Sequence, residues 1–172
     1  MKLRTILLAL PITLLATTAI AGGNHAGGHG HAEDSVGKAG VASKVSRTVT
    51  VDMTDAMRFN PSSIDVKQGE TIRFIVKNSG KVKHELVLGT EKELKEHYEV
   101  MKKHPEMEHE DPNMVTVAPG KTGEMIWQFT KAGKIDFACL QPGHYDAGMK
   151  GLVNVAGAKS AGKEPAHGDH KH

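Results

Sequence analysis

Seven short runs of β-branched and apolar residues, separated by turn-forming residues, most constrain the fold of this 172-residue chain. The runs are residues 49–53, 63–66, 71–77, 85–88, 125–130, 134–139 and 151–155. In the third run, Ile72, Phe74 and Val76 alternate with other residues, as in a strand with one face toward a core. Evenly spaced strands without alternating helical patterns favour an antiparallel β-sandwich over a sheet of β-α-β units. The sequence therefore predicts an all-β domain of about seven or eight strands.

One segment interrupts this pattern and is predicted to be a helical insertion over residues 91–103. Thr90 and Glu93 have the spacing of a capping box, which marks the start of a helix. Apolar side chains then recur at helical spacing, at Leu94, Tyr98 and Met101. The following acidic stretch, residues 106–114, is expected to wrap over one end of the sandwich as a loop.

The two ends of the chain differ in composition from the predicted domain. Residues 1–21 combine basic residues with an apolar stretch and a small-residue cleavage pattern, which indicates a secretory signal peptide. The apolar stretch of about 15 residues is shorter than the roughly 20 needed to cross a bilayer. Residues 22–44 and 158–172 are rich in Gly, Ala and His and poor in large apolar side chains, so both are expected to be disordered. This leaves one folded domain over residues 45–157 of an exported, soluble protein.

Charge and cysteine content exclude several classes of function. The 22 Lys and Arg residues nearly balance the 20 Asp and Glu residues, unlike the strongly basic balance of a nucleic-acid-binding protein. Because Cys139 is the only cysteine, the chain can form no intramolecular disulfide and no multi-cysteine zinc or iron–sulfur site. A free thiol in an oxidising compartment needs burial or a metal. With 11 histidines and eight methionines, this thiol belongs to a set of side chains that bind soft and borderline transition metals.

The segment from Cys139 to Met149 has the spacing Cys-x4-His-x4-Met, with His144 at its centre. One loop can thus present a thiolate, an imidazole and a thioether to one ion. Copper that changes between Cu(II) and Cu(I) is well served by two imidazoles and a thiolate in a near-trigonal plane, with a weak axial thioether. The second imidazole must come from elsewhere, and His84 directly precedes the predicted strand at residues 85–88. Greek-key connections bring such distant segments side by side, so we predict a shared copper site.

Each of these residues also has a simpler interpretation when taken alone. A cysteine often packs as a small hydrophobe and a methionine often fills a gap in a core, while His84 alone suits a hydrogen-bonded structural histidine. Their joint spacing favours the metal, because a loop with Gly and Pro contributes little to a core unless something organises it. A thiol hydrolase with Cys139 activated by His144 or His84 is a further alternative. The sequence singles out no orienting partner or oxyanion donor for that chemistry, so we do not expect an enzyme.

Several motifs between about residues 47 and 156 carry a family resemblance. They are Met53-x3-Met57-Arg58-Phe59-x-Pro61, Gly69-Glu70-Thr71, His84-Glu85-x-Val87-Leu88-Gly89-Thr90, Asp111-Pro112-Asn113-Met114 and the segment from Cys139 to Gly151. With these motifs the chain resembles the cupredoxins, the plastocyanin and azurin superfamily of type 1 copper proteins. Within that superfamily it is most similar to exported bacterial copper-tolerance cupredoxins.

The resemblance implies a Greek-key cupredoxin sandwich that binds one type 1 copper ion through His84, Cys139, His144 and Met149. It also implies that His84 is the more buried imidazole and that electrons pass through an exposed His144. The residue after the first histidine is asparagine in several blue electron carriers, whereas this chain has Glu85.

The implied function is that of a soluble periplasmic protein of copper tolerance and homeostasis, which sequesters or redox-buffers copper by one-electron Cu(II)/Cu(I) cycling. The alternative is a soluble electron carrier between respiratory redox partners. Expected partners are copper ions and a periplasmic redox or copper-handling protein. No nucleic acid partner and no membrane insertion after signal cleavage are expected.

We further hypothesise weaker copper binding outside this site. Imidazoles in the Gly-rich ends can bind Cu(II), and these are His25, His29, His31, His167, His170 and His172. A second candidate, a Cu(I) site, comprises His104, Met107, His109 and Met114, because thioethers suit the softer ion. The alternatives are solvated tails without metal and methionines that pack the loop against the sandwich.

Overall fold

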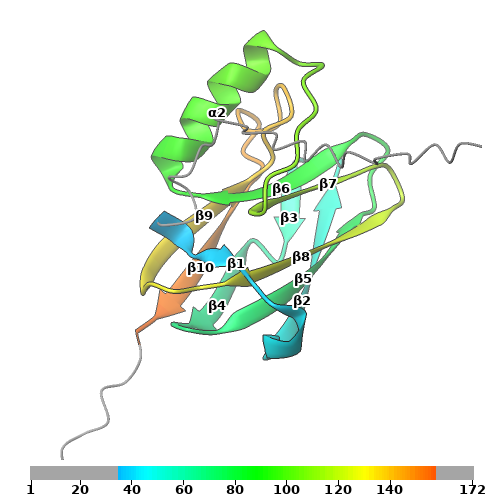
Figure 1. Cartoon of the computed structure of the whole chain (residues 1–172). Helices are drawn as coiled ribbons and strands as arrows, with labels where there is room; N and C mark the ends of the chain where they lie inside the picture. The colour runs from blue at the N-terminus through cyan, green and yellow to red at the C-terminus, as the bar shows by residue number, and fades with distance from the viewer. Residues whose placement is uncertain (1–34, 158–172) are drawn as a thin grey trace, which may run out of the picture.

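Two five-stranded sheets pack face to face in the computed structural model, which describes residues 35–157 (Figure 1). The first sheet contains, in spatial order, β1 (Lys38–Ala39), β8 (Thr122–Gln128), β5 (Thr71–Asn78), β2 (Arg47–Thr54) and β3 (Arg58–Asn60). The second contains β4 (Ser63–Lys67), β10 (Lys150–Ala156), β9 (Gly133–Ala138), β6 (His84–Gly89) and β7 (Met114–Val117). The predicted β-sandwich is confirmed.

All seven predicted strands are present, and the structure adds three that the sequence analysis did not identify. These are β1, β3 and β7, each of two to four residues and each at the edge of a sheet. The expectation of an antiparallel sandwich is wrong at two pairs, since β2 pairs with β5 and β10 with β4 in parallel. Parallel neighbours cannot be joined by a hairpin. The chain therefore passes through β4 in the opposite sheet before it returns to β5 beside β2.

The core lies between the two sheets and reaches the end of the sandwich where β9 stops. Ile72, Phe74 and Val76 of β5 are buried in it, as their alternation predicts. Cys139 and Met149 belong to the same cluster of buried side chains. The candidate ligands are thus held by the packing that stabilises the whole domain.

The predicted helix is confirmed as α2 (Glu91–Lys103), and its capping box is formed. The Thr90 hydroxyl accepts from the Glu93 N–H, while the Glu93 carboxylate accepts from the Thr90 N–H at 2.8 Å. A second buried cluster joins the helix to the outer face of β6 and β9, through Val87, Leu94, Tyr98, Met101, Ala138, Leu140 and Tyr145. Because both faces of β6 are covered, all six of its residues are buried. Figure 1 shows the helix over this part of the second sheet.

The expectation that residues 22–44 stay outside the fold is wrong for residues 35–44. β1 pairs with β8, and the side chain of Val36 is fully buried in the core. The indole N–H of Trp127 donates to the Val36 carbonyl at 3.1 Å, which gives a buried donor the partner it needs. Composition could not reveal this, because the attachment consists of one buried valine, one hydrogen bond from an indole and a two-residue strand.

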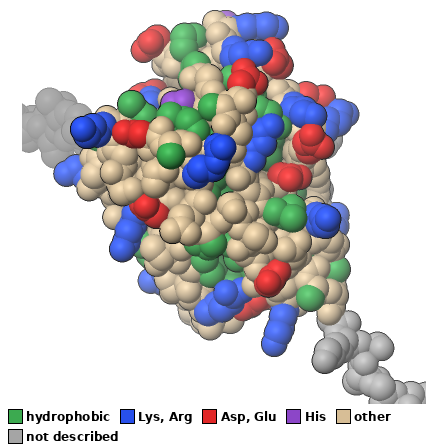
Figure 2. All heavy atoms as spheres, turned by 180° about the vertical axis from the view of Figure 1, so that it is seen from behind, with side chains coloured by type: hydrophobic (Ala, Val, Ile, Leu, Met, Phe, Trp, Pro, Cys, Tyr) green, Lys and Arg blue, Asp and Glu red, His purple; other side chains and the backbone are tan. Residues whose placement is uncertain are grey.

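The predicted signal peptide and both histidine-rich ends lie outside the described residues. Within residues 35–157, no helix has the length and apolar character needed to span a membrane. On the face shown in Figure 2, basic and acidic side chains are interspersed, as the nearly balanced charge of the sequence leads one to expect.

Candidate metal centre

The pairing of β6 with β9 brings the candidate ligands together. His84 is the first residue of β6, and Cys139 directly follows the last residue of β9. The two strands are antiparallel, with Val87 opposite Ala138. His144 and Met149 lie in the loop that connects β9 to β10. Residues more than 50 positions apart in the chain therefore meet at one end of the sandwich.

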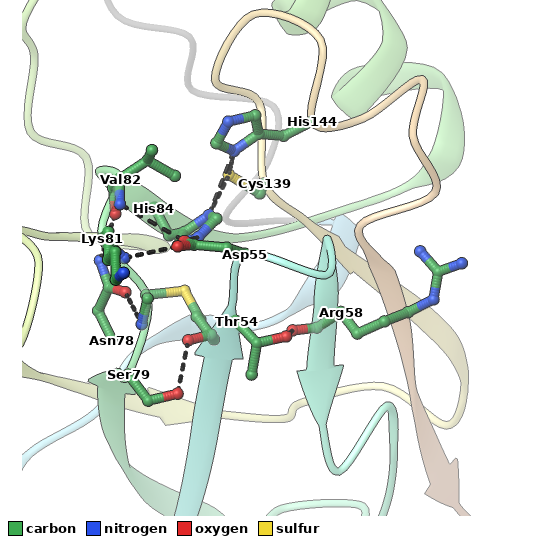
Figure 3. A network of polar contacts seen from close by, with 12 residues as sticks. Thr54, Asp55, Arg58, Asn78, Ser79, Lys81, Val82, His84, Cys139 and His144 are labelled. Carbon is green, nitrogen blue, oxygen red and sulfur yellow. Dashed lines mark hydrogen bonds and ion pairs between the residues drawn. The ribbon is translucent and has the colours of Figure 1, made fainter.

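Three donor atoms converge there, as Figure 3 shows. The Nδ1 atoms of His84 and His144 are 3.2 Å apart. The Cys139 Sγ lies 3.3 Å from Nδ1 of His144 and 4.0 Å from Nδ1 of His84. These three separations place the centre of the triangle about 2.1 Å from every donor, close to the length of a transition-metal bond to nitrogen. A single metal ion of that kind fits between them.

Burial makes these side chains suitable ligands. His84 and Cys139 are fully buried, and His144 is partly exposed. Burial raises the pKa of the Cys139 thiol to about 12, so a bound cation is needed to hold it as a thiolate at neutral pH. Burial, with the neighbouring His84, lowers the pKa of His144 and favours the neutral imidazole that binds metal. Two imidazoles and one thiol that a cation would deprotonate match the donor set of a copper site.

Met149 is also fully buried, and backbone hydrogen bonds place it beside two of the other candidate ligands. The Cys139 N–H donates to the Met149 carbonyl at 3.1 Å. The Met149 N–H donates to the His144 carbonyl at 3.0 Å. The loop thus folds back on itself, and its first and last candidate ligands are neighbours.

Glu85 ties β6 to the start of this loop. Its side chain is 2% exposed, and its carboxylate accepts from the Leu140 N–H at 3.0 Å and from Nε2 of Gln141 at 2.9 Å. Its own N–H points at the Cys139 Sγ from 3.5 Å. A buried carboxylate with these partners fixes the position of the cysteine relative to β6.

Sequence reasoning missed Asp55, which lies in the turn between β2 and β3. Its Oδ1 is 3.2 Å from Nε2 of His84. A hydrogen bond from the Lys81 N–H, with a further one from His84, lowers the pKa of the Asp55 carboxyl. Only the hairpin geometry reveals this contact, because 29 residues separate the two side chains.

Tyr98 connects α2 to the same loop. Its hydroxyl donates to Oδ2 of Asp146 at 2.8 Å and accepts from the Gly143 N–H at 3.0 Å. Its ring packs against that of Tyr145, with centroids 5.1 Å apart. The helix therefore holds the loop on both sides of His144.

The loop after α2 borders an open cavity of about 680 Å³. Its lining includes Met107, His109 and Met114, three of the four residues in the hypothesised second site, together with Met101. His104 caps the C-terminus of α2 and is not among the lining residues. Both ring nitrogens of His109 are buried without a hydrogen-bond partner in the described structure.

A family model described as copper binding proteins of the plastocyanin/azurin family matches residues 45–156. The chain is also similar to proteins named copper-resistant cuproprotein CopI. The one from Rubrivivax gelatinosus is 52% identical over 149 residues, which cover 83% of this chain and 90% of the relative. The one from Pseudomonas aeruginosa is 35% identical over 175 residues, covering 85% of this chain and 96% of the relative.

Solved structures of auracyanins share the fold. Reduced auracyanin from Roseiflexus castenholzii matches with a TM-score of 0.55 and 22% identity, over 65% of this chain and 98% of that one. Auracyanin A, a blue copper protein from Chloroflexus aurantiacus, matches with a TM-score of 0.53 and 22% identity, over 63% of this chain and 97% of that one. At this identity the likeness establishes the architecture.

We expect Tyr98→Phe to loosen the loop, because the Gly143 N–H and the Asp146 carboxylate both lose a partner. The free energy of unfolding should fall by about 1–2 kcal/mol, and amide hydrogen exchange at Gly143 should accelerate. Tyr145→Phe is the matched control, since its hydroxyl makes no hydrogen bond within the described residues. Equal exchange rates at Gly143 in the two variants would contradict the role given to Tyr98.

Proposed function

Because the chain belongs to the plastocyanin/azurin family of copper-binding proteins, we propose that His84, Cys139, His144 and Met149 hold one type 1 copper ion. The observation that carries this proposal is that Nδ1 of His84, Nδ1 of His144 and Sγ of Cys139 lie 3.2–4.0 Å from one another. When bound, copper supplies one-electron exchange between Cu(II) and Cu(I).

The protein's contribution is to hold these donors in a fixed arrangement. His84 and Cys139 are buried and exclude water, and the carboxylate of Glu85 restrains the loop that carries the cysteine. A rigid set of donors rearranges little when the charge of the bound ion changes, and this favours fast electron exchange. His144 is the partly exposed donor, so it is the ligand through which the site can contact solvent or a partner protein.

We assign the chain to copper tolerance and homeostasis in the periplasm, where it sequesters or redox-buffers copper. Support comes from the relatives named as copper-resistant cuproproteins, one of which is 52% identical over most of both chains. The secretory pattern of residues 1–21 supports export. The protein acts by binding and electron exchange and not as an enzyme, and its partner is a periplasmic redox or copper-handling protein.

The alternative is an electron carrier between respiratory partners. It would use the same four side chains, and the partly exposed His144 would serve either role. The names of the relatives favour copper tolerance.

Deleting the gene should separate these two functions. The proposal predicts that the deletion strain becomes hypersensitive to copper while its respiration at low copper is unchanged. Growth should be restored by the natural gene and not by one carrying Cys139→Ser. A respiratory defect at low copper with normal copper tolerance would instead establish the electron carrier.

We also propose a Cu(I) site in the cavity beside α2, with His109 and the thioethers of Met101, Met107 and Met114 as donors. The imidazole of His109 supports it, because neither ring nitrogen makes a hydrogen bond in the described structure and the nearest carboxylate oxygen, on Asp111, is 3.7 Å from Nε2. Thioether and imidazole donors suit the softer copper ion.

Anaerobic Cu(I) titration against a chromophoric chelator tests this second site in the full chain. His109→Ala should lose one equivalent of tightly bound Cu(I). His104→Ala is the matched control and should keep it, because His104 lies outside the cavity lining. Equal stoichiometry in the two variants would show that the cavity holds no Cu(I).

A further inference from the structure

Asp55 places a carboxylate against the ring nitrogen of His84 that does not face the other donors (Figure 3). The ring is held at both ends. Its Nε2 lies 3.2 Å from Oδ1 of Asp55, while its Nδ1 faces His144 and Cys139. A fully buried imidazole that contacts a carboxylate at one nitrogen and the metal position at the other is oriented by that carboxylate.

The turn after β5 is built to hold this carboxylate. The Lys81 N–H donates to Oδ2 at 2.8 Å, and the Val82 N–H donates to Oδ1 at 3.4 Å. A glycine at residue 80 leaves room for this carboxylate, because a Cβ here would overlap Oδ1 of Asp55 and force the Asp55 side chain to move. Asn78 steadies the turn through hydrogen bonds from its Nδ2 to the carbonyls of Val82 and Val117.

An ionised carboxylate can only accept hydrogen bonds, so its contact with Nε2 requires the proton of a neutral His84 ring to be on Nε2. Nδ1 then presents its lone pair to the space shared with His144 and Cys139. A carboxylate partner also makes the imidazole a more basic ligand, which stabilises the more highly charged ion.

We propose that Asp55 is a positioning residue that fixes the His84 ring and tautomer and shifts the affinity of the site toward Cu(II) relative to Cu(I). This inference rests on the proposed copper site and deepens it. A carboxylate behind His84 thus lowers the reduction potential of the site relative to a site without it. Asp55 lies in the hairpin between β2 and β3. This hairpin is next to the proposed copper ligands but contains none of them.

The test is Asp55→Asn in the full chain, which keeps an acceptor of similar size and removes the charge. Because the Asp55 side chain is 39% exposed, the change leaves no buried cavity. We expect affinity for Cu(II) relative to Cu(I) to fall about tenfold. For one electron, that fold-change corresponds to a rise in reduction potential of about 59 mV.

Asp52→Asn is the matched control for charge. Asp52 lies on the same hairpin, and its Oδ2 accepts from the Ser79 hydroxyl at 2.8 Å, with no hydrogen bond to His84 in the described structure. Gly80→Ala is a second variant that keeps the Asp55 charge and displaces the carboxylate. The potential should rise in Asp55→Asn and Gly80→Ala and change little in Asp52→Asn.

The tautomer of His84 is read separately, by ¹⁵N NMR of the copper-free protein. A proton on Nε2 in the natural sequence supports the proposal. A proton on Nδ1, or equal potential shifts in Asp55→Asn and Asp52→Asn, would overturn it. Failure of the natural protein to form a thiolate–copper band would instead overturn the proposed function, and the NMR measurement would still decide the Asp55 contact.

Discussion

The alignment of β6 with β9 is the constraint on which the candidate copper site depends. Hydrogen bonds between these strands bring the start of β6 beside the end of β9, so that His84 meets Cys139 without any direct chain connection. A shift of one residue would turn each side chain of β6 to the opposite face of the sheet. The two imidazoles and the thiol share one space only in the register that buries Leu86 and Leu88 in the core. The strand register that packs the sandwich is therefore also the register that assembles the site.

Elements outside the ligand loop restrain it from several directions. Glu85 binds its first residues, Tyr98 of α2 binds its middle, and backbone hydrogen bonds join its two ends. The helix is a local insertion with its own capping box, yet its buried face packs on the outer side of β6 and β9. Such restraints limit how far the donors can move when the charge of a bound ion changes, which is what the proposed redox role of a copper protein requires.

Much of the fold could be predicted because local patterns and tertiary structure agree. The alternation of apolar residues predicted β5, and the capping box predicted the start of α2. The spacing from Cys139 to Met149 predicted the ligand loop. The short edge strands were missed because strands of two to four residues with one paired side show little periodicity. Asp55 and the attachment of Val36 were missed for a different reason, since each depends on one contact between segments far apart in sequence.

The most direct measurement of the central claim is the visible absorption spectrum of the copper-loaded natural protein beside that of Cys139→Ser. A single copper ion held by the buried thiol gives an intense sulfur-to-copper band, and the variant should lose that band while its β-sheet circular dichroism persists. An equally intense band in the variant, or none in the natural protein with one copper bound, would contradict the account.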